Sequence, residues 1–408
     1  MQIIEVTTNR DKKEFHDFPR WLYRNDQCWV CPLDSEIEGI FDPAKNHTFK
    51  HGVTTRWILK NDNGKTIGRV AAFIDNVRSA AQKQPTGGMG FFEVIEDKKA
   101  AYLLFDTAKE WLSARGMEAM DGPINFGEND NFWGLLIDGF VQQGYGMPYN
   151  KKYYRELFES YGFKNYFEQY SYHREARNEK GEFTRFPERL WKVAEWVAKK
   201  PGYSFRHFEF SNARKYAVDI CEIYNSTWLY LKEDFTPIIP EVLEEAMRKA
   251  KPVLDEETII FMYHNDKPVG FWVLLPDLNQ ILKYINGKLD IISLIKFLYH
   301  KKTHKMTRLR AVVGGVKHSH QNQGIEAAIF YHLYEVFGKK PWYKEIELSW
   351  VGDYNPRMMA SNEALGGIRM KTHCTFRYMI NDKLAFMRYK DEMAEKQRNK
   401  EEKKAGQE

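Results

Sequence analysis

Apolar runs separated by short polar turns predict two β-hairpins that lie far apart in the chain. Residues 61–74 read N-D-N-G-K-T-I-G-R-V-A-A-F-I and follow a short apolar run at 57–59. Residues 265–275 read N-D-K-P-V-G-F-W-V-L-L and follow another apolar run at 259–263. A polar, glycine-containing turn between two such runs is typical of a hairpin.

The two hairpins belong to an internal repeat. Gly68 and Gly270 lie 202 positions apart, while Gly162 in L-F-E-S-Y-G-F and Gly366 in S-N-E-A-L-G-G lie 204 positions apart. Two landmarks at nearly one offset indicate a duplicated domain. The expected segments are a first domain over 1–175, a linker helix within 176–204, a second domain over 205–390 with an insertion at 277–306, and a charged tail over 391–408.

The second copy shows its elements most clearly, because its helical and strand periodicities are regular. In chain order we expect a strand at 205–210, helices at 213–228 and 240–253, the hairpin, a strand at 307–316, a helix at 324–337, a strand at 345–351, a helix at 356–365 and a strand at 369–380. This order predicts an α/β fold in which each copy has a mixed central sheet flanked by helices.

Composition narrows the class of protein. The 408 residues suit two domains, and 61 basic against 56 acidic residues are too evenly balanced for nucleic acid to be the main partner. The four cysteines include the pair Cys28 and Cys31 without further ligands at zinc spacing, so we expect neither a disulfide framework nor a metal site. The N-terminus does not read as a signal peptide, which predicts a cytoplasmic protein. The aromatic content of 15% suggests a lined pocket.

The turn after the strand at 307–316 resembles the donor turn of the GNAT family of acyl-CoA-dependent N-acyltransferases. It reads K-H-S-H-Q-N-Q-G-I-E-A-A. The family pattern is Gln or Arg, two residues, Gly, one residue, then Gly or Ala. Gln321 and Gly324 match this pattern, and Glu326 departs from it.

The resemblance implies how an acyl donor would bind. In the family, pantetheine pairs with an exposed strand edge and the pyrophosphate lies on backbone N–H groups at a helix start. The donor-binding residues expected from this are Val313, Gly314, Gly315, Val316, Gln321, Asn322, Gln323, Gly324 and Ile325. A carboxylate at 326 would repel a pyrophosphate, so an acyl-carrier protein is an alternative donor to acyl-CoA.

Catalytic residues are harder to assign. Near the donor turn, Glu326 and His318 are candidate bases, followed by His320 and Asp353. A later family motif is matched at Asn355, while Asn362 replaces its tyrosine, so Asn355 and Asn362 complete the catalytic candidates. The first copy has no glycine after its strand at 88–93, and we expect it to shape the acceptor site instead of binding the donor.

Residues 121–140, D-G-P-I-N-F-G-E-N-D-N-F-W-G-L-L-I-D-G-F, are similar to a segment of bacterial tandem-GNAT proteins. The expected substrate-binding residues are Asn125, Glu128, Asn129, Asp130, Trp133 and Tyr149. An alternative is a loop in which Asp130 caps a helix that starts near Phe132. We expect Phe132, Tyr145, Tyr153 and Tyr154 to join Trp133 and Tyr149 in the wall of a cleft between the copies.

The insertion at 277–306 contains a predicted helix at 289–300 with a broad apolar face, and five basic residues follow it: Lys301, Lys302, Lys305, Arg308 and Arg310. The more ordinary interpretation buries this face against the other domain. The other places residues 288–310 on an anionic bilayer and makes the protein membrane-peripheral, with a lipid amine as acceptor.

The resulting functional prediction is direct acyl transfer from acyl-CoA to an amine. Bacterial ceramide synthases resemble GNAT proteins, and N-acylation of a sphingoid base or other amino-lipid by a long acyl chain fits this chain. The alternative is a catalytically degenerate protein that binds an acyl ligand or a partner. Aminoacyl transfer from tRNA, as in other doubled GNAT-like enzymes, is disfavoured by the modest net charge.

Overall fold

The computed structural model describes residues 1–129, 131–185, 187–228 and 237–405. The first half contains β1 (Gln2–Glu5), α1 (Asn9–Leu22), α2 (Asp34–Ile40), η1 (His47–Lys50), β2 (Gly52–Lys60), β3 (Thr66–Asp75), α3 (Asn76–Ala81), β4 (Thr86–Val94), α4 (Lys98–Ser113), β5 (Ala119–Gly122), β6 (Leu135–Asp138), α5 (Tyr154–Tyr161) and β7 (Lys164–Glu175). The connecting helix is α6 (Glu188–Ala198).

The second half repeats this order. It contains β8 (Tyr203–His207), η2 (Phe210–Asn212), α7 (Ala213–Trp228), α8 (Pro240–Ala250), η3 (Glu256–Thr258), β9 (Ile259–His264), β10 (Lys267–Pro276), α9 (Asn279–Leu282), α10 (Ile291–Thr303), β11 (Arg308–Val316), η4 (His318–His320), α11 (Ile325–Lys339), β12 (Glu345–Gly352), α12 (Pro356–Ala364), β13 (Ile368–Met379) and α13 (Tyr389–Ala405). The predicted duplication and the α/β plan are thus confirmed.

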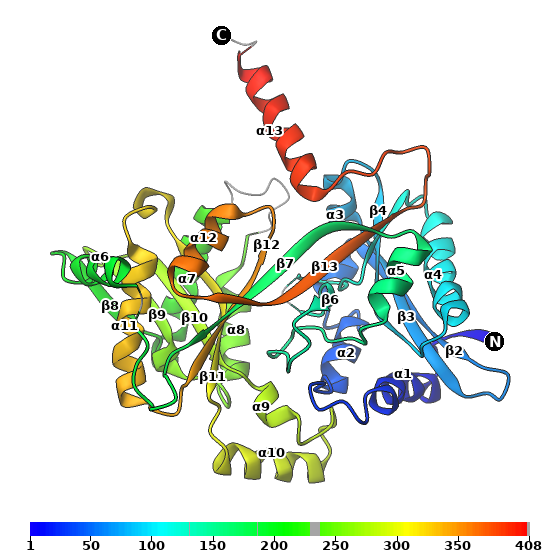
Figure 1. The fold of residues 1–408 in the computed structure, drawn as a ribbon, viewed down its shortest axis with the longest axis horizontal. Coiled ribbons are helices and arrows are strands. Elements are labelled where there is room, and N and C mark those ends of the chain that lie inside the picture. Colours follow the sequence, from blue (N-terminus) through cyan, green and yellow to red (C-terminus); the bar gives the residue numbers. More distant parts are fainter. Residues whose placement is uncertain (130, 186, 229–236, 406–408) are drawn as a thin grey trace.

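One continuous sheet joins the two halves, as Figure 1 shows. Its strand order is β1-β2-β3-β4-β5-β13-β7-β12-β11-β10-β9-β8, with β6 attached to β13. The last strand of each half therefore lies in the sheet of the other half: β7 pairs with β12, and β13 pairs with β5. The two exchanged strands also pair with each other along most of their length.

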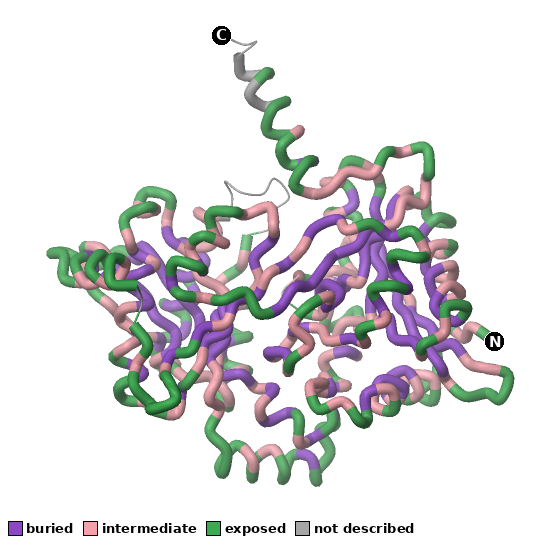
Figure 2. The backbone as a smooth tube through the Cα atoms, in the orientation of Figure 1, coloured by how far each residue is buried: buried purple, intermediate pink, exposed green. Residues whose placement is uncertain are grey.

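This exchange was not predicted, because a strand's periodicity reports which face is buried and not which neighbour it pairs with. Each of the expected segments, 1–175 and 205–390, contributes its final strand to the other. The complete sheet therefore requires both halves. The buried positions follow the sheet across the whole molecule (Figure 2).

Each half has its own hydrophobic core, which packs against one long helix: α4, which follows β4, in the first half, and α11, which follows β11, in the second. In the first half α4 buries Leu104 and Phe105 completely, and in the second half α11 buries Ala328 and Ile329. Truncation of a fully buried Phe to alanine typically costs about 3–5 kcal/mol. The α6 linker helix packs on α11, where the Trp191 ring lies 4.6 Å from those of Tyr331 and Tyr334.

One expectation needs correction. Residues 131–134 form bends that lead directly into β6, so the described part of this segment does not begin a helix near Phe132. The charged tail is helical as far as Ala405 in α13, and the first turn of α13 is anchored because Glu392 accepts hydrogen bonds from Tyr166 (2.8 Å) and Arg377 (3.3 Å). Among the described helices, none combines the length and apolar character that crossing a bilayer requires.

Candidate active site

The strands β11 and β12 part in the middle of the second half. Their parallel pairing covers only Arg308 to Ala311 against Glu345 to Leu348, although both strands continue further. On its other side β11 stays paired with β10, with an irregularity that skips Val312. The backbone of residues 312–316 therefore presents an edge toward β12 that has no strand partner in the described part of the chain.

The donor loop, which we define as residues 317–324, lies at the open end of β11. Gly324 is the N-cap of α11 and has φ of 78°, and this cap carries no side-chain hydrogen bond among the described residues. The Gln321 amide donates to Val316 O at 3.2 Å and ties the loop back to the strand. Helix-start N–H groups without a side-chain cap are of the kind that can bind a phosphate.

Helix α12 brings a cation to this loop that the sequence pattern did not reveal. The exposed guanidinium of Arg357 donates to Gln321 Oε1 (3.2 Å) and to Asn322 Oδ1 (2.8 Å). One turn further along α12, the Ser361 hydroxyl donates to Glu326 Oε2 at 3.2 Å. The carboxylate that departs from the family pattern is therefore held against α12, the helix that also supplies the positive charge.

The residues predicted as catalytic do not converge on one point. Asn355 caps α12, since its Oδ1 accepts from Met358 N at 3.2 Å, and Asn362 is buried within the same helix. His318 begins the turn η4 on the exposed side of the donor loop. Of the further candidates, His320 faces His264 and Asp353 forms an ion pair with Arg388 at 2.7 Å.

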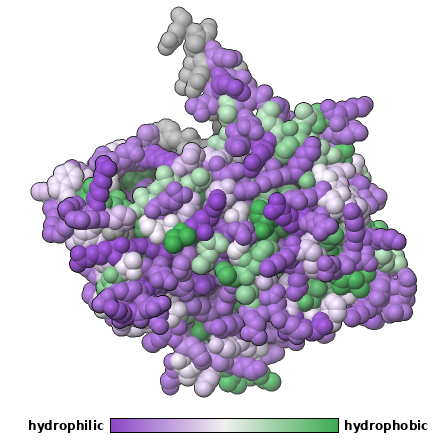
Figure 3. All heavy atoms as spheres, viewed as in Figure 1, coloured by the Kyte–Doolittle hydropathy of each residue, from purple (hydrophilic) through white to green (hydrophobic). Residues whose placement is uncertain are grey.

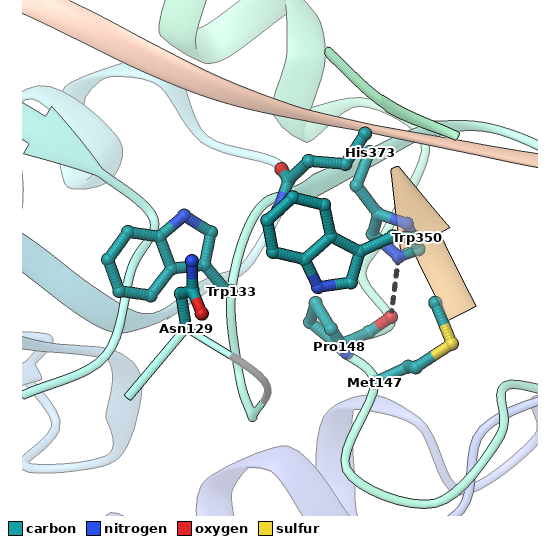
Figure 4. A pocket seen from close by; sticks show the side chains of 7 residues that line it. Asn129, Trp133, Met147, Pro148, Trp350 and His373 are labelled. Atoms are coloured by element: carbon teal, nitrogen blue, oxygen red, sulfur yellow. Dashed lines mark hydrogen bonds between the residues drawn. The ribbon is translucent and has the colours of Figure 1, made fainter. Parts of the chain in front are cut away.

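A small central hollow, with room only for a water-sized molecule, lies between the two halves near the point where β11 and β12 part (Figure 4). Trp350 of β12 lies two residues beyond the last β11–β12 pair, which joins Ala311 and Leu348. The hollow draws on loops of the first half and on β7, β12 and β13. Its lining residues are Asn129, Trp133, Met147, Pro148, Gln169, Trp350 and His373.

His373 is the titratable side chain in this lining. Its Nε2 lies 3.1 Å from Pro148 O, which can only accept, so Nε2 carries the proton and Nδ1 is left as an acceptor. Burial lowers the pKa of His373 to about 4, and the imidazole is therefore neutral at pH 7. Gln169 Nε2, also in the lining, is buried and has no hydrogen-bond partner among the described residues.

The residues predicted to bind the acceptor lie in different places in the structure, and only some of them line the hollow. Asn129 and Trp133 line the hollow, and the indole Nε1 of Trp133 donates to Thr375 Oγ1 at 3.1 Å. Asn125 is buried nearby and Glu128 is exposed. The Tyr149 hydroxyl instead bonds both oxygens of Asp26 at 3.1 Å. Asp130 lies outside the described residues.

The expectation that Tyr153 and Tyr154 wall the cleft is wrong, whereas Tyr145 does lie between the halves, because it packs with Leu33 of the first half and with Leu282 and Ile285 of the second. Tyr154 and Tyr153 bind the end of β4, where Val94 N donates to the Tyr154 hydroxyl (2.8 Å) and Val94 O accepts from the Tyr153 hydroxyl (2.7 Å). Tyr145 packs against residues of the insertion. The tyrosines of the first half therefore cover a strand edge and support the insertion.

The equivalent donor position in the first half is filled by the chain itself. The Asp97 carboxylate caps α4 by accepting from the backbone N–H groups of Lys99 (2.8 Å) and Ala100 (3.0 Å). Along β4, Met89 O accepts from Ile124 N at 2.8 Å. A helix start that is already capped by an anion does not offer a phosphate site.

A buried ion network near His373 connects the two halves. Glu347 of β12 accepts from Lys371 of β13 at 2.5 Å, and both side chains are almost completely buried. Burial raises the pKa of Glu347, but the nearby positive charges of Lys371, Arg310 and Arg308 outweigh it and leave the pKa below its usual value. Arg310 in turn donates to Tyr145 O in the first half.

The fold matches that of solved tandem GNAT proteins. A tandem GNAT protein from the clavulanic acid biosynthesis pathway superposes with a TM-score of 0.55 at 12% identity, covering 93% of this chain and 98% of that one. A GCN5-related glucosamine N-acetyltransferase region of a fungal multi-domain β-N-acetylglucosaminidase gives 0.53 at 11% identity, covering 92% of this chain and 38% of that one. The chain has the tandem GNAT N-acetyltransferase fold.

Two proteins whose sequences are more similar to this chain are its distant homologues. Protein YghO of Escherichia coli (strain K12) is 26% identical over 378 residues, which covers 91% of this chain and 93% of that protein. Bacterial ceramide synthase of Caulobacter vibrioides (strain NA1000 / CB15N) is 26% identical over 382 residues, covering 91% and 96%. No family model matches the chain.

Proposed function

We propose that this protein is an N-acyltransferase that transfers an acyl group from acyl-CoA to the amine of a lipid, such as a sphingoid base. The observation that carries the proposal is the start of α11, which has no side-chain cap among the described residues, at the end of a strand edge that no described strand pairs with. The distant homology to the protein named bacterial ceramide synthase supports a lipid amine as the acceptor class.

Donor binding uses the second half. The pantetheine arm would pair with the free edge at residues 313–316, and the pyrophosphate would lie on the first N–H groups of α11. Arg357 supplies a positive charge at the donor loop, which offsets the repulsion expected from Glu326. This charge balance favours acyl-CoA over an acyl-carrier protein as donor.

The reaction is a direct attack. The neutral amine, bound in the hollow, adds to the thioester carbonyl, and backbone N–H groups of the free β11 edge stabilise the oxyanion. Collapse of this adduct forms the amide, expels the CoA thiolate and transfers the amine proton to a base, with or without an intervening water. Of the candidate bases Glu326, His318 and His373, His373 lines the hollow with Nδ1 as an acceptor, and because its pKa is about 4 it would pass the proton on to water instead of keeping it.

The acceptor site is apolar where a lipid chain would need it. Trp133, Trp350 and Met147 supply rings and a thioether, while Gln169 offers a buried donor without a partner. In this structure the hollow has room only for a water-sized molecule, so a hydrocarbon chain attached to the amine would have to widen it or lie outside it. A lipid acceptor also implies that the protein works at a membrane surface.

The test is a transfer assay on the purified protein. Acyl-CoA donors of increasing chain length are mixed with sphingoid bases or other amino-lipids, and the amide is detected by mass spectrometry. We expect an amide whose mass combines the acyl chain of the donor with the added amine, and lipid extracts of cells without the gene should lack the same species. Absence of any amide, together with no thermal shift on adding CoA, would exclude the proposal.

The second candidate is an acyl-ligand-binding protein without catalysis. It is favoured by one specific observation, since Asn362 provides no hydroxyl where the family has tyrosine and Asn355 is used as a helix cap. This candidate predicts a thermal shift with acyl-CoA but no amide product. An acyl-carrier protein included as a separate donor shows which thioester is bound.

A further inference from the structure

The apolar residues of the insertion point outward from the protein. Seven large apolar side chains in and next to α10 are 50–79% exposed, and they form what we call the α10 face: Leu289, Ile291, Ile292, Leu294, Ile295, Leu298 and Tyr299. Figure 3 shows hydrophobic side chains at the lower edge of the molecule, where α10 lies in Figure 1. A face of this kind normally marks an interaction site.

The opposite side of α10 holds the helix to the protein. Ser293 is buried, and Phe297 packs with the cluster that contains Leu282 and Ile285. Asp290 caps the helix by accepting from Ser293 N at 2.8 Å. The helix is thus fixed in place with its apolar side exposed.

The interpretation in which this apolar face packs against the other domain is wrong. The contact with the first half is made by α9 and the turn that follows it, where Leu282 and Ile285 pack on Leu33. The turn is also held by Arg20, whose Nε donates to Asn286 O at 3.0 Å. The α10 face lies outside this contact and remains on the surface.

The charges around the face have one sign. Exposed lysines flank it, and they are Lys288, Lys296, Lys301, Lys302 and Lys305. Within residues 288–310 the sequence has a single acidic residue, Asp290, and this residue serves as the helix cap. Arg308 is drawn into the ion network with Asp277 and Glu347, and Arg310 is buried beside it, so the surface charge comes from the lysines.

We propose that the α10 face docks this protein on an anionic lipid bilayer. The helix would lie in the plane of the interface with its isoleucines and leucines below the headgroups, and the lysines would contact lipid phosphates. A second copy of the chain is a poorer occupant, because a two-fold contact would bring the same lysines face to face. With thirteen residues, α10 lies on a bilayer and does not cross it.

The face is connected to the central hollow through a short segment of the first half. Phe297 of α10 and Tyr145 belong to one cluster, and Tyr145 N donates to Asp277 Oδ1 at 2.9 Å. Two residues further along the chain, Met147 lines the hollow. A bilayer in contact with α10 would therefore lie on the side of the protein from which this segment leads to the hollow. The docking itself does not depend on the transferase activity.

The experiment is vesicle flotation of the full chain without substrates. Vesicles of phosphatidylcholine with about a third phosphatidylglycerol are compared with pure phosphatidylcholine, at low and high salt. We expect binding to the anionic vesicles, weakened by salt, and at least tenfold weaker binding for the double variant Ile291→Asp, Ile295→Asp. The matched control is Val218→Asp, Ile368→Asp, two exposed apolar positions elsewhere, which should bind like the unchanged protein.

Three outcomes would overturn the proposal. One is failure of the unchanged protein to float with anionic vesicles, and another is equal binding by both double variants. The third is a dimer in sedimentation that only the α10 variant dissociates, without vesicle binding, which would assign the face to a second copy. Because no acyl donor is present, these results are independent of whether the protein transfers acyl groups.

Discussion

Asp97 and Gly324 occupy the same position in the two halves, as the N-cap of the helix that follows the splayed strand. Asp97 satisfies the start of α4 with its own carboxylate, whereas Gly324 leaves the start of α11 without a side-chain cap. One half thus carries a built-in anion at this position, and the other has a glycine there, over which Val193 and Val197 of α6 lie. This difference makes the donor site testable with one substitution.

The first prediction concerns Gly324→Asp. The new carboxylate should occupy the N–H groups of α11 and repel a pyrophosphate, so binding of CoA should weaken at least tenfold in calorimetric titration. Gly324→Asn is the control, since asparagine has the same shape and tolerates the φ of 78° without the charge. Equal affinity of the two variants would place the pyrophosphate elsewhere.

The second prediction concerns Arg357. Because its guanidinium reaches the donor loop, Arg357→Ala should raise KM for acyl-CoA about tenfold with little change in kcat, and Arg357→Lys should recover part of the loss. Arg155→Ala on α5, an exposed arginine in the first half, is the control. A variant that lowers kcat alone would argue against a role in donor binding.

The third prediction separates two roles for Glu326. If the carboxylate held by Ser361 mainly repels the donor, Glu326→Gln should lower KM for acyl-CoA and leave kcat within about threefold. A fall in kcat of a hundredfold or more would instead identify Glu326 as the base. Steady-state kinetics at several pH values distinguish these results.

The fourth prediction is a pH dependence of stability. The pKa of His373 is about 4 in the folded protein and about 6.5 when unfolded, so the unfolded state alone takes up a proton between these values. Stability should therefore fall as the pH drops from 7 to 5, and this residue should account for about 2 kcal/mol of the fall. In urea unfolding, the free energy of unfolding of His373→Gln should fall by about 2 kcal/mol less than that of the unchanged protein between pH 7 and pH 5. An equal fall in both proteins would contradict the lowered pKa of His373.

The fifth prediction follows from the exchange of β7 and β13. Residues 1–184 expressed alone should not give a cooperative unfolding transition, because β5 then lacks β13 as its neighbour. Co-expression of 1–184 with 187–408 should restore a folded complex that purifies together. A fragment 1–184 that folds and melts cooperatively by itself would show that β7 can return to its own half.

The sequence predicted the elements well because their periodicity is local. For example, the last strand was expected at 369–380 and is found at Ile368–Met379. Trp350, His373 and Arg357 could not be predicted as site residues, because long-range strand pairing and the packing of α12 bring them to the site. The exposure of Ile291 likewise depends on which side of α10 faces the protein, which periodicity alone does not determine.

The shared sheet has a consequence for how this chain can change over generations. The first half has no open donor position, yet it cannot be discarded, because its final strand completes the neighbouring sheet and its loops wall the hollow. A copy that loses its donor site can therefore still complete the sheet, whereas loss of the whole copy would remove strands that the sheet needs. The two halves thus stay fused in one sheet even though their helix starts differ, one capped by Asp97 and the other beginning at Gly324.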